Sequence, residues 1–356
     1  MNIREVARVA KVSTATVSRT INGSDKVTPE TKERVQRAIE ELKFYPNTWA
    51  RALGSGHSSL YGLIISDITN PFFPELVKSF EDIAVQNGQE VLIANTNYDP
   101  ARMDLCVSRM LQRKVDGVAI MTSEMDGKLI TELHNREIPL VFLDTGQAQG
   151  LTSNIEVNYA AGVDAAVEHI VSMGHTEIAF ISGPMMLRSA RVRKEAFAGC
   201  LERKGIGAGL MEEGNHQVDG GHQAMARLLR GKLRPTAVLA SNDMTAIGAL
   251  GAIHEMGLRV PEDISIVGFD DIQISAFTQP ALTTVRLSRD EIARVAFRAL
   301  YSIRQEGGRG AEYRVEPSLV VRKSTGPAPV RAKATRLKVM AGTRVSTELH
   351  QRGGGA

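Results

Sequence analysis

The first 22 residues have the spacing of apolar positions that is typical of two short helices joined by a turn. Apolar residues stand at positions i, i+3, i+4 and i+7 of the first segment: Ile3, Val6, Ala7 and Ala10. Asn2 precedes this stripe and Glu5 follows it by three positions, which is the spacing of a capping box at a helix N-terminus. Lys11 and Val12 then supply the turn, and Ser13 is placed to cap a second helix.

The second predicted helix carries apolar and polar side chains on opposite faces. Val17 and Ile21 share the inner face, which must pack against partners because a helix of about two turns is not stable alone in water. The outer face has small residues and one arginine, which suits entry into a DNA major groove. A solvated helical hairpin in an ordinary domain would show the same pattern. The predicted DNA-facing residues are Ser13, Thr14, Ala15, Thr16, Ser18, Arg19 and Asn22.

A third helix and a short linker follow. Thr28 and Pro29 have the order of an N-cap and a first helical residue, and the apolar stripe that continues to Leu42 closes a three-helix headpiece over residues 1–46. In residues 47–58, Asn47 is a plausible cap and glycines end the segment. The pattern predicts a helix-turn-helix headpiece followed by a short hinge helix and linker.

From Leu60 the pattern changes to short apolar runs that alternate with helical segments. Such alternation predicts parallel sheets covered by helices on both faces. Two series of these units, over residues 59–158 and 159–287, indicate two similar α/β lobes. The predicted strands are Leu60–Ile65, Glu90–Asn95, Gly117–Met121, Leu140–Leu143, Ile178–Ile181, Ala237–Ala240 and Ser265–Phe269, and a further strand is predicted at Tyr313–Val321.

Polar and aromatic side chains recur directly after these strands. Parallel sheets bind ligands beyond the carboxyl ends of their strands, and amides, carboxylates and aromatic rings together suit a polyhydroxylated ligand. Each residue alone is equally explained as a cap or turn residue. The residues predicted to converge are Asp67, Asn70, Phe72, Phe73, Ser123, Asp144, Ser189, Arg193, Asn242 and Asp270.

Three sequence segments together resemble the lactose-repressor/galactose-repressor family of bacterial transcription regulators. They are the run Val-Ser-Thr-Ala-Thr-Val-Ser-Arg at residues 12–19, the Tyr-Pro-Asn that follows the headpiece, and the Ala-Arg-Ala-Leu that ends at Leu53. The resemblance extends from Asn2 to about Ser324. It implies a periplasmic-binding-protein-like core of two lobes, a homodimer that binds a pseudo-palindromic operator in double-stranded DNA, and a small-molecule effector in the cleft between the lobes.

The resemblance also assigns roles to single residues. It implies that Leu53 is an apolar wedge in the minor groove and that Arg193 grips the effector. It places His216 where an aromatic ring often covers the ligand, and a histidine there would offer hydrogen bonds instead, so the identity of the ligand stays open. Among small-molecule effectors, a sugar or sugar derivative is expected rather than a purine. It further implies that residues 288–320 cross back to lobe one.

The net charge of +3 is unevenly distributed. Residues 1–58 carry a net charge of +4 and residues 327–356 one of +5, so the residues between them are acidic. A basic headpiece is expected of a DNA-binding protein. Residues 327–356 lack apolar periodicity and end in glycines, and we predict a disordered basic tail. Two interpretations of this tail remain open: its charge adds nonspecific affinity for DNA, or it is a solvated tail without a binding role.

Other classes of protein fit the sequence less well. A solute-binding protein of a transport system would share the two-lobed core, but it would not need the headpiece, and the N-terminus lacks a secretory signal. An enzyme on an α/β scaffold remains an alternative, although no metalloprotease, phosphate-loop or nucleophile-elbow motif is present. Cys106 and Cys200 have no metal-binding spacing, and no long apolar stretch predicts a membrane helix. We therefore expect a cytoplasmic, ligand-responsive repressor without cofactor or metal.

Overall fold

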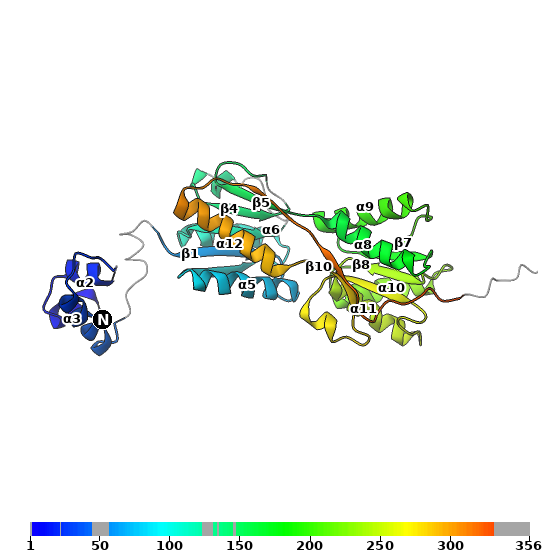
Figure 1. Ribbon diagram of the computed structural model, residues 1–356, viewed down its shortest axis with the longest axis horizontal. Helices are drawn as coiled ribbons and strands as arrows, with labels where there is room; N and C mark the ends of the chain where they lie inside the picture. Colours follow the sequence, from blue (N-terminus) through cyan, green and yellow to red (C-terminus); the bar gives the residue numbers. More distant parts are fainter. Residues whose placement is uncertain are drawn as a thin grey trace, which may run out of the picture.

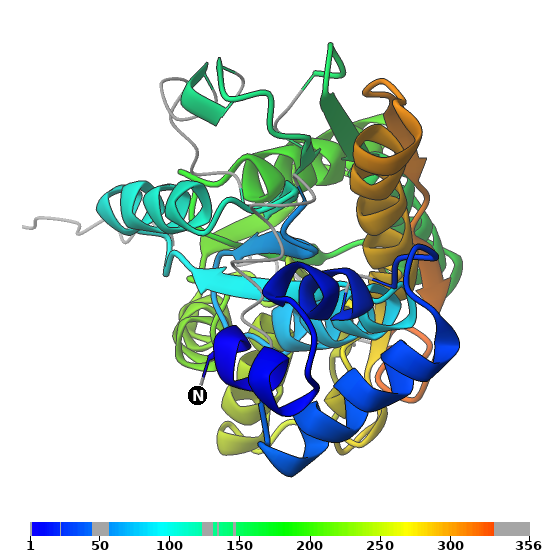
Figure 2. The same ribbon diagram turned by 90° about the vertical axis from the view of Figure 1, so that its left-hand side faces the viewer.

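The computed structural model describes residues 2–21, 23–44, 57–122, 131–133, 135–144 and 147–330. Three helices form the N-terminal headpiece at the left of Figure 1 and nearest the viewer in Figure 2: α1 Ile3–Val9, α2 Thr14–Ile21 and α3 Pro29–Glu41. The predicted capping box of Asn2 and Glu5 is present, and Thr28 caps α3. Each helix contributes a fully buried valine to the small core, namely Val6, Val17 and Val35.

An arginine joins the first and third helices of the headpiece. The Nη2 of Arg34 on α3 donates to the backbone oxygen of Ala10 at 2.5 Å and to that of Lys11 at 3.2 Å. These carbonyls belong to the end of α1, where helical hydrogen bonding stops, so Arg34 stabilises the turn that orients α2. Lys11 has a positive φ of 54°, as a tight turn at this place requires.

Lobe one contains a parallel sheet of six strands in the order β11-β5-β4-β3-β1-β2. Its described helices are α5 Phe72–Gln86, α6 Pro100–Gln112 and α12 Arg289–Glu306. The strands are β1 Leu60–Ile65, β2 Glu90–Asn95, β3 Gly117–Met121, β4 Leu140–Leu143, β5 Thr152–Val157 and β11 Glu312–Val315. Figure 1 shows α12 lying along this lobe.

Lobe two repeats the arrangement with the strand order β12-β10-β9-β8-β6-β7, in which only β12 is antiparallel. Its helices are α8 Tyr159–Ser172, α9 Arg188–Arg203, α10 Val218–Arg230 and α11 Asp243–Glu255, with the 3-10 helix η1 Gln273–Ala276. Its strands are β6 Ile178–Ser182, β7 Leu210–Glu213, β8 Ala237–Ala240, β9 Ser265–Asp270, β10 Thr283–Arg286 and β12 Ser318–Val320.

Two sequence-based expectations about the C-terminal part are wrong. The predicted single strand Tyr313–Val321 is two strands, because β11 belongs to the sheet of lobe one whereas β12 pairs with β10 in lobe two. Pro317 lies between them and has no N–H for a ladder hydrogen bond. Residues 318–320 therefore do not belong to lobe one as predicted.

The predicted disordered tail also begins too early. Residues 327–330 are described, and the backbone N–H of Ala328 donates to the carbonyl oxygen of Met173 at 2.9 Å. Just before them, the backbone oxygen of Gly326 lies 3.0 Å from the Nε2 of the buried His175. The chain thus packs onto lobe two as far as Ala328, and residues 331–356 lie outside the described residues.

The apolar strand patterns predicted buried sheets, and every residue of β3, β6, β8 and β9 is buried. Three strands that the sequence pattern missed are β5, β7 and β10, which lie next to an edge strand or at the edge. Helix α5 begins at Phe72 with Pro71 as its N-cap. Among the described residues no helix is long and apolar enough to cross a membrane.

Candidate functional site: a cavity between the lobes

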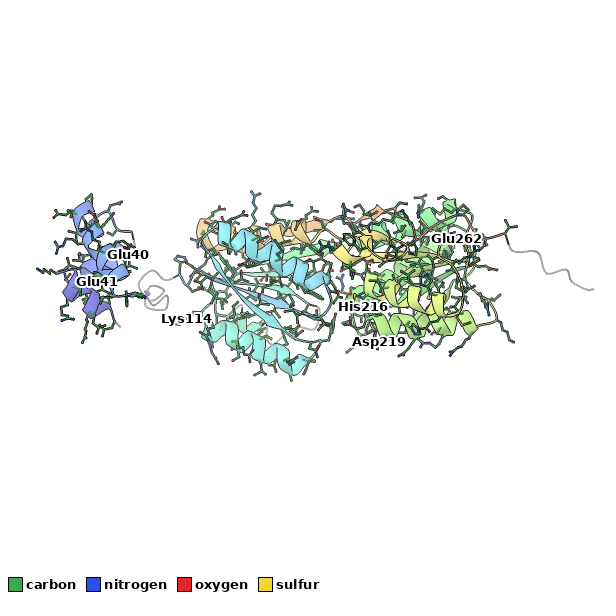
Figure 3. The ribbon with its side chains drawn as sticks, turned by 90° about the horizontal axis from the view of Figure 1, so that it is seen from below. Glu40, Glu41, Lys114, His216, Asp219 and Glu262 are labelled. Carbon is green, nitrogen blue, oxygen red and sulfur yellow. The ribbon has the colours of Figure 1, made fainter. Side chains whose placement is uncertain are left out.

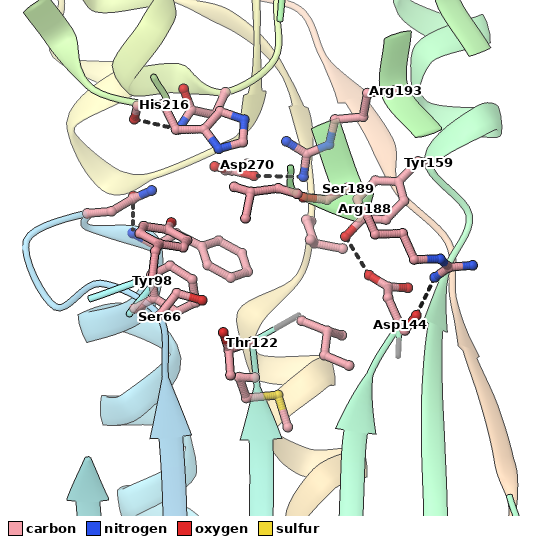
Figure 4. A pocket seen from close by; sticks show the side chains of 18 residues that line it. Ser66, Tyr98, Thr122, Asp144, Tyr159, Arg188, Ser189, Arg193, His216 and Asp270 are labelled. Atoms are coloured by element: carbon pink, nitrogen blue, oxygen red, sulfur yellow. Dashed lines mark hydrogen bonds and ion pairs between the residues drawn. The ribbon is translucent and has the colours of Figure 1, made fainter. Parts of the chain in front are cut away.

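A cavity of about 90 Å³ lies between the lobes, where the carboxyl ends of the strands of both sheets face each other (Figure 4). Ser66 and Thr122 follow strands of lobe one, whereas Asn242 and Leu287 follow strands of lobe two. His216 marks this junction in Figure 3. The cavity is lined by Ser66, Asn70, Phe72, Phe73, Tyr98, Met121, Thr122, Leu143, Asp144, Tyr159, Leu187, Arg188, Ser189, Arg193, His216, Asn242, Asp270 and Leu287.

Arg193 is the buried cation of this cavity. It lies in the second turn of α9, only 6% exposed, with its guanidinium carbon 4.7 Å from the ring centre of Tyr159 and 4.2 Å from that of Phe269. Its Nη1 donates to the backbone oxygen of Ser241, and its Nη2 is 3.8 Å from the Oδ1 of Asp270. Its buried Nε has no hydrogen-bond partner among the residues that the structure describes. An orphaned charged donor is costly, so the geometry favours a ligand oxygen there.

Asp270 provides the opposite charge at the end of β9. Burial raises its pKa to about 6, although the positive charges of Arg193 and Arg289 oppose that rise. Its φ of 109° is unusual for a residue with a side chain, and Arg289 Nη1 donates to its backbone oxygen at 2.5 Å. The main chain of β9 is thus held so that the carboxyl group lies in the cavity beside Arg193 (Figure 4).

His216 lines the cavity as a neutral imidazole. Burial, together with the charge of Arg193, lowers its pKa to about 3. Asn242 Nδ2 donates to the backbone oxygen of His216 at 3.0 Å, and within the described part of the chain the buried Nε2 of His216 has no hydrogen-bond partner. A Cβ on Gly183 would lie 1.9 Å from that Nε2, so only glycine admits the ring here. A neutral imidazole offers one hydrogen-bond donor and one acceptor.

Asp144 closes the cavity on the side of lobe one. Its carboxyl oxygens accept from the N–H of Val157 at 2.7 Å and from the hydroxyl of Tyr159 at 2.5 Å. Burial raises the pKa of Asp144, and these donors partly offset the rise. Arg188, the first residue of α9, donates to the backbone oxygen of Asp144, so that a lobe-two arginine contacts lobe one at the edge of the cavity (Figure 4).

Phe72 and Phe73 form the aromatic part of the lining. They lie in the first turn of α5, with ring centres 5.3 Å apart in an edge-to-face arrangement. The Oδ1 of Asn70 accepts from the N–H of Phe72 at 3.1 Å and fixes the entry to the helix. Rings beside carboxylates and amides allow one site to cover an apolar ring face and to bind hydroxyl groups.

Nine of the eleven residues predicted for the cleft line the cavity, counting His216. The prediction for Asp67 is wrong in detail, because its carboxylate does not line the cavity but accepts from Thr69 and, across the lobes, from Gln217 Nε2 at 2.7 Å. Asn242 lines it, yet its Oδ1 also caps α11 through the N–H of Thr245. Ser123 lies outside the described residues.

The cavity also contains residues that sequence reasoning missed. Tyr159 follows β5, a strand that the apolar pattern did not reveal, and Tyr98 lies just beyond the carboxyl end of β2. Leu187 and Arg188 directly precede Ser189, which was predicted to line the cleft. Placing the start of α9 at these residues would have added them to the predicted site. Leu287 follows the missed strand β10.

In the headpiece, the predicted DNA-facing residues lie on the outer side of α2 and just before it. Ser13, Thr14, Ala15 and Arg19 are exposed, while Thr16 and Ser18 are half-buried. Ser13 Oγ accepts from the N–H of Thr16 at 3.0 Å and so caps α2, as predicted. Asn22 and Leu53 lie outside the described residues.

The fold and the site define a transcription regulator with a helix-turn-helix headpiece and a two-lobed binding core. Residues 2–47 match the model for bacterial regulatory proteins of the lacI family, and residues 167–325 match that for a periplasmic binding protein-like domain. The ribose operon repressor of Escherichia coli (strain K12) is 34% identical over 307 residues, covering 84% of this chain and 91% of that protein.

Two further relatives cover more of the chain. The HTH-type transcriptional repressor PurR of Erwinia tasmaniensis is 34% identical over 336 residues, 92% of this chain and 98% of its own length. The crystal structure of the lac repressor dimer bound to operator and the anti-inducer ONPF superposes with a TM-score of 0.83 at 31% identity, covering 92% of this chain and 99% of that one. The chain therefore belongs to the lacI family of bacterial regulatory proteins, and it is a transcriptional repressor rather than an enzyme.

Proposed function

We propose that this repressor binds a pseudo-palindromic operator as a homodimer and that a sugar or sugar derivative in the cavity between the lobes controls this binding. The observation that carries the proposal is a pair of buried nitrogen atoms in the cavity, Arg193 Nε and His216 Nε2, for which the described residues supply no hydrogen-bond partner. They lie among lining carboxyl groups and phenylalanine rings. This set matches a small, largely uncharged ligand with several hydroxyl groups.

The charges of the cavity support an uncharged effector. The cations Arg188 and Arg193 are balanced by the carboxyl groups of Asp144 and Asp270, and His216 is neutral. Hydroxyl groups of a ligand donate to carboxylates and accept from guanidinium groups. A ligand with a strong charge of its own would leave the cavity with an uncompensated buried charge.

A purine is the second candidate effector. The aromatic pair of Phe72 and Phe73 would stack against a purine ring as readily as against the apolar face of a sugar. The ribose operon repressor and PurR have the same identity to this chain, so the relatives do not favour one class over the other.

For the DNA, we propose that α2 enters the major groove and that its exposed residues meet base edges. Arg19 is suited to a bidentate contact with guanine and Ala15 to a thymine methyl group, while Thr14 contacts an adjacent base or the backbone. The same face includes Ser13, Thr16, Ser18 and Asn22. For Leu53, which lies outside the described residues, the proposal is an apolar wedge in the minor groove.

Effector control follows from the site lying between two lobes. A ligand that contacts both lobes favours the lobe arrangement in which those contacts are made, and it shifts the equilibrium by its difference in affinity for the two arrangements. Here Asp144 and Phe73 belong to lobe one, and Arg193 and Asp270 to lobe two. The lobe arrangement would in turn set the separation of the two headpieces in the dimer.

The proposal is tested with the full chain and two measurements. Thermal unfolding is recorded with a panel of pentoses, hexoses and purine bases, since a ligand that binds only the folded state raises its stability. Operator binding is then titrated with and without the stabilising compound, using a duplex that the protein selects from a randomised pool. Stabilisation by purine bases alone would replace the sugar by a purine, and selection of no duplex would contradict the proposed function.

A further inference from the structure

Asp116 holds the chain at the point where it enters lobe one from the headpiece linker. Its Oδ1 accepts from the N–H of Ser58 at 3.2 Å, and its Oδ2 accepts from the N–H of Ser59 at 2.7 Å. Asp116 is only 3% exposed and its own N–H donates to the carbonyl oxygen of Leu60 at 2.7 Å. One carboxylate thus binds both amides that precede β1.

These residues lie at the amino ends of β1 and β3, because Ser58 and Ser59 precede Leu60 and Asp116 precedes Gly117. In a parallel sheet this end is opposite to the carboxyl ends that face the cavity. Figure 3 shows Lys114, two residues before Asp116, at the end of lobe one that faces the headpiece. The anchor is therefore remote from the effector cavity.

Arg304 connects this anchor to the C-terminal end of α12. Its Nη2 lies 3.2 Å from the Oδ1 of Asp116. Aromatic contacts fix the same helix on lobe one, since the ring of Phe297 lies 5.5 Å from that of Tyr61 on β1 and 5.7 Å from that of Phe80 on α5. The helix is therefore packed on the same sheet whose amino end carries the anchor.

The other end of α12 contacts the segment that carries the cavity carboxylate. Arg289 donates to the backbone oxygens of Asp270 at 2.5 Å and Asp271 at 2.8 Å, and its Nε lies 2.8 Å from Glu75 Oε2. Glu75 in turn accepts from the N–H of Gln273 in lobe two at 2.9 Å. In Figure 1 this end of α12 lies at the junction of the lobes and the other end lies toward the headpiece.

We infer that Asp116 and Arg304 are positioning residues for DNA binding: they fix the departure point of the headpiece linker and, through α12, tie it to the cavity segment. The inference rests on the proposed function, because it concerns how a headpiece that binds DNA is held. Arg289 and Arg304 are fifteen positions apart on α12, which corresponds to about 22 Å along a helix. The helix spans lobe one from the junction to the linker.

A positioning role has a consequence that a purely structural role lacks. Binding to a two-fold duplex needs two headpieces at one separation, whereas nonspecific binding needs only the positive charge of each headpiece. Releasing the linker leaves the headpiece charge unchanged. Loss of the anchor should therefore weaken binding to the selected duplex and spare binding to random DNA.

The experiment compares Asp116→Asn, Arg304→Gln and Arg304→Lys with the wild-type full chain. Each protein is titrated with the duplex that the wild type selects from a randomised pool and with a scrambled duplex of the same length at the same salt concentration. Asp164→Asn is the matched control, because Asp164 accepts from Arg203 at 2.7 Å and 2.8 Å on the surface of lobe two, away from the linker. Thermal unfolding of each variant reports whether the core is intact.

We expect Asp116→Asn to weaken binding of the selected duplex by about tenfold and Arg304→Gln by about threefold, as charged hydrogen bonds are lost. Arg304→Lys, which keeps the charge, should restore most of the affinity, and Asp164→Asn should bind like the wild type. Binding to scrambled DNA should stay within about twofold. If Asp116→Asn does not fold, Arg304→Gln is the deciding variant. The Arg304 side chain is partly exposed, so its replacement should leave the core folded.

Two results would overturn the inference. Either Arg304→Gln binds the selected duplex as tightly as the wild type, or its affinities for selected and scrambled duplexes fall by the same factor. Failure of the proposed function is a different result, because the wild type itself would then select no duplex.

Discussion

At the scale of single residues, the main feature of the molecule is the group of ionisable side chains buried near the cavity. Asp243 lies at the start of α11 and accepts from the hydroxyls of Ser275 and Thr284, each at 2.5 Å, and from the N–H of Ile272 at 2.9 Å. Burial, together with the nearby charge of Asp270, raises its pKa to about 8. Asp243 thus holds η1 and β10 through hydrogen bonds in the interior of lobe two, whereas Asp270 faces the cavity.

Because the pKa of Asp270 is raised to about 6, we expect the proposed effector binding to depend on pH. Ligand hydroxyl groups that donate to this carboxylate favour its ionised form, so binding is strong above about pH 6 and weakens as protonation proceeds below it. We expect the effector Kd to rise about tenfold between pH 7.5 and pH 5. Calorimetric titration across this range measures it.

The Asp270→Asn variant is the control for this dependence. It should bind more weakly at neutral pH and lose most of the change between pH 7.5 and pH 5. His216, whose pKa is lowered to about 3, stays neutral throughout, so a residual change would come from Asp144, the other cavity carboxyl group whose pKa is raised by burial. An equal pH dependence in the variant would assign the effect to another group.

Arg19 is expected to read a base. Replacement by alanine should cost about 1–3 kcal/mol on the selected duplex and relax the preference at one base pair in each half-site. The reason is its exposed place on a helix face that otherwise has small side chains. Arg37→Ala is the control, because Arg37 is an exposed arginine on α3 that pairs with Glu33 at 2.5 Å. Equal losses on selected and scrambled duplexes would show that Arg19 contacts only phosphate.

At the scale of elements, lobe two depends on the close crossing of α10 and α11. A Cβ on Gly221 of α10 would lie 2.2 Å from the backbone oxygen of Thr245, and one on Gly248 of α11 would lie 1.9 Å from that of Val218. Backbone therefore meets backbone at both glycines. Since α11 begins at Asn242 and Asp243, this crossing also sets the position of residues at and beside the cavity.

Gly248→Ala should separate the two helices and destabilise lobe two by about 3 kcal/mol, because the backbone cannot move away as a flexible side chain would. Gly251→Ala is the matched control on the same helix. Its Cβ would meet only the Cδ2 of His222 at 3.5 Å, an ordinary contact, and better helix propensity should raise stability by up to about 1 kcal/mol. Thermal unfolding of the full chain compares them, and equal stability of the two variants would contradict the close crossing.

At the scale of the whole molecule, two sheets face one cavity and the chain passes between them three times. The crossings follow β5, β10 and β11, and two of them are joined where Asn158 Nδ2 donates to Glu316 Oε2 at 2.7 Å. Contacts such as that between Gln217 and Asp67 also hold the lobes together on the cavity side. In the proposed function, a ligand in the cavity would act on the relative position of the lobes through these connections.

Arg193→Ala should abolish the effect of the effector on operator binding while ligand-free operator affinity stays within about threefold of the wild type. The coupling that is lost is expected to be about 1–3 kcal/mol. The salt dependence of operator binding should not change, because no headpiece charge is altered. Operator titration with and without saturating effector measures both quantities, and thermal unfolding checks that the core remains folded.

The result that would contradict this prediction is a variant that binds operator normally and still responds fully to the effector. The effector site would then have to lie elsewhere on the core, and the Nε of Arg193, which no described residue pairs, would need another explanation.

Local features with local causes could be predicted from the amino-acid sequence. The caps of Asn2, Ser13 and Thr28, the apolar stripes of the headpiece and the buried central strands follow from side-chain chemistry within a few positions. Because the carboxyl ends of parallel strands meet at one edge, it was also possible to predict that Asp144, Arg193 and Asp270 would line one cavity.

Features that depend on contacts between distant segments could not be predicted in this way and are seen only in the folded chain. Strands β11 and β12 are separate because β11 pairs with β5 in the sheet of lobe one and β12 pairs with β10 in the sheet of lobe two. Strands β5, β7 and β10 form because neighbouring strands provide their hydrogen-bond partners. Likewise, Asp67 turned out to contact Gln217, and Asp116 to hold Ser59, because chain folding brings them together. No pattern within a short window encodes such pairings, since their energy comes from burial and hydrogen bonds that exist only when both segments are in place.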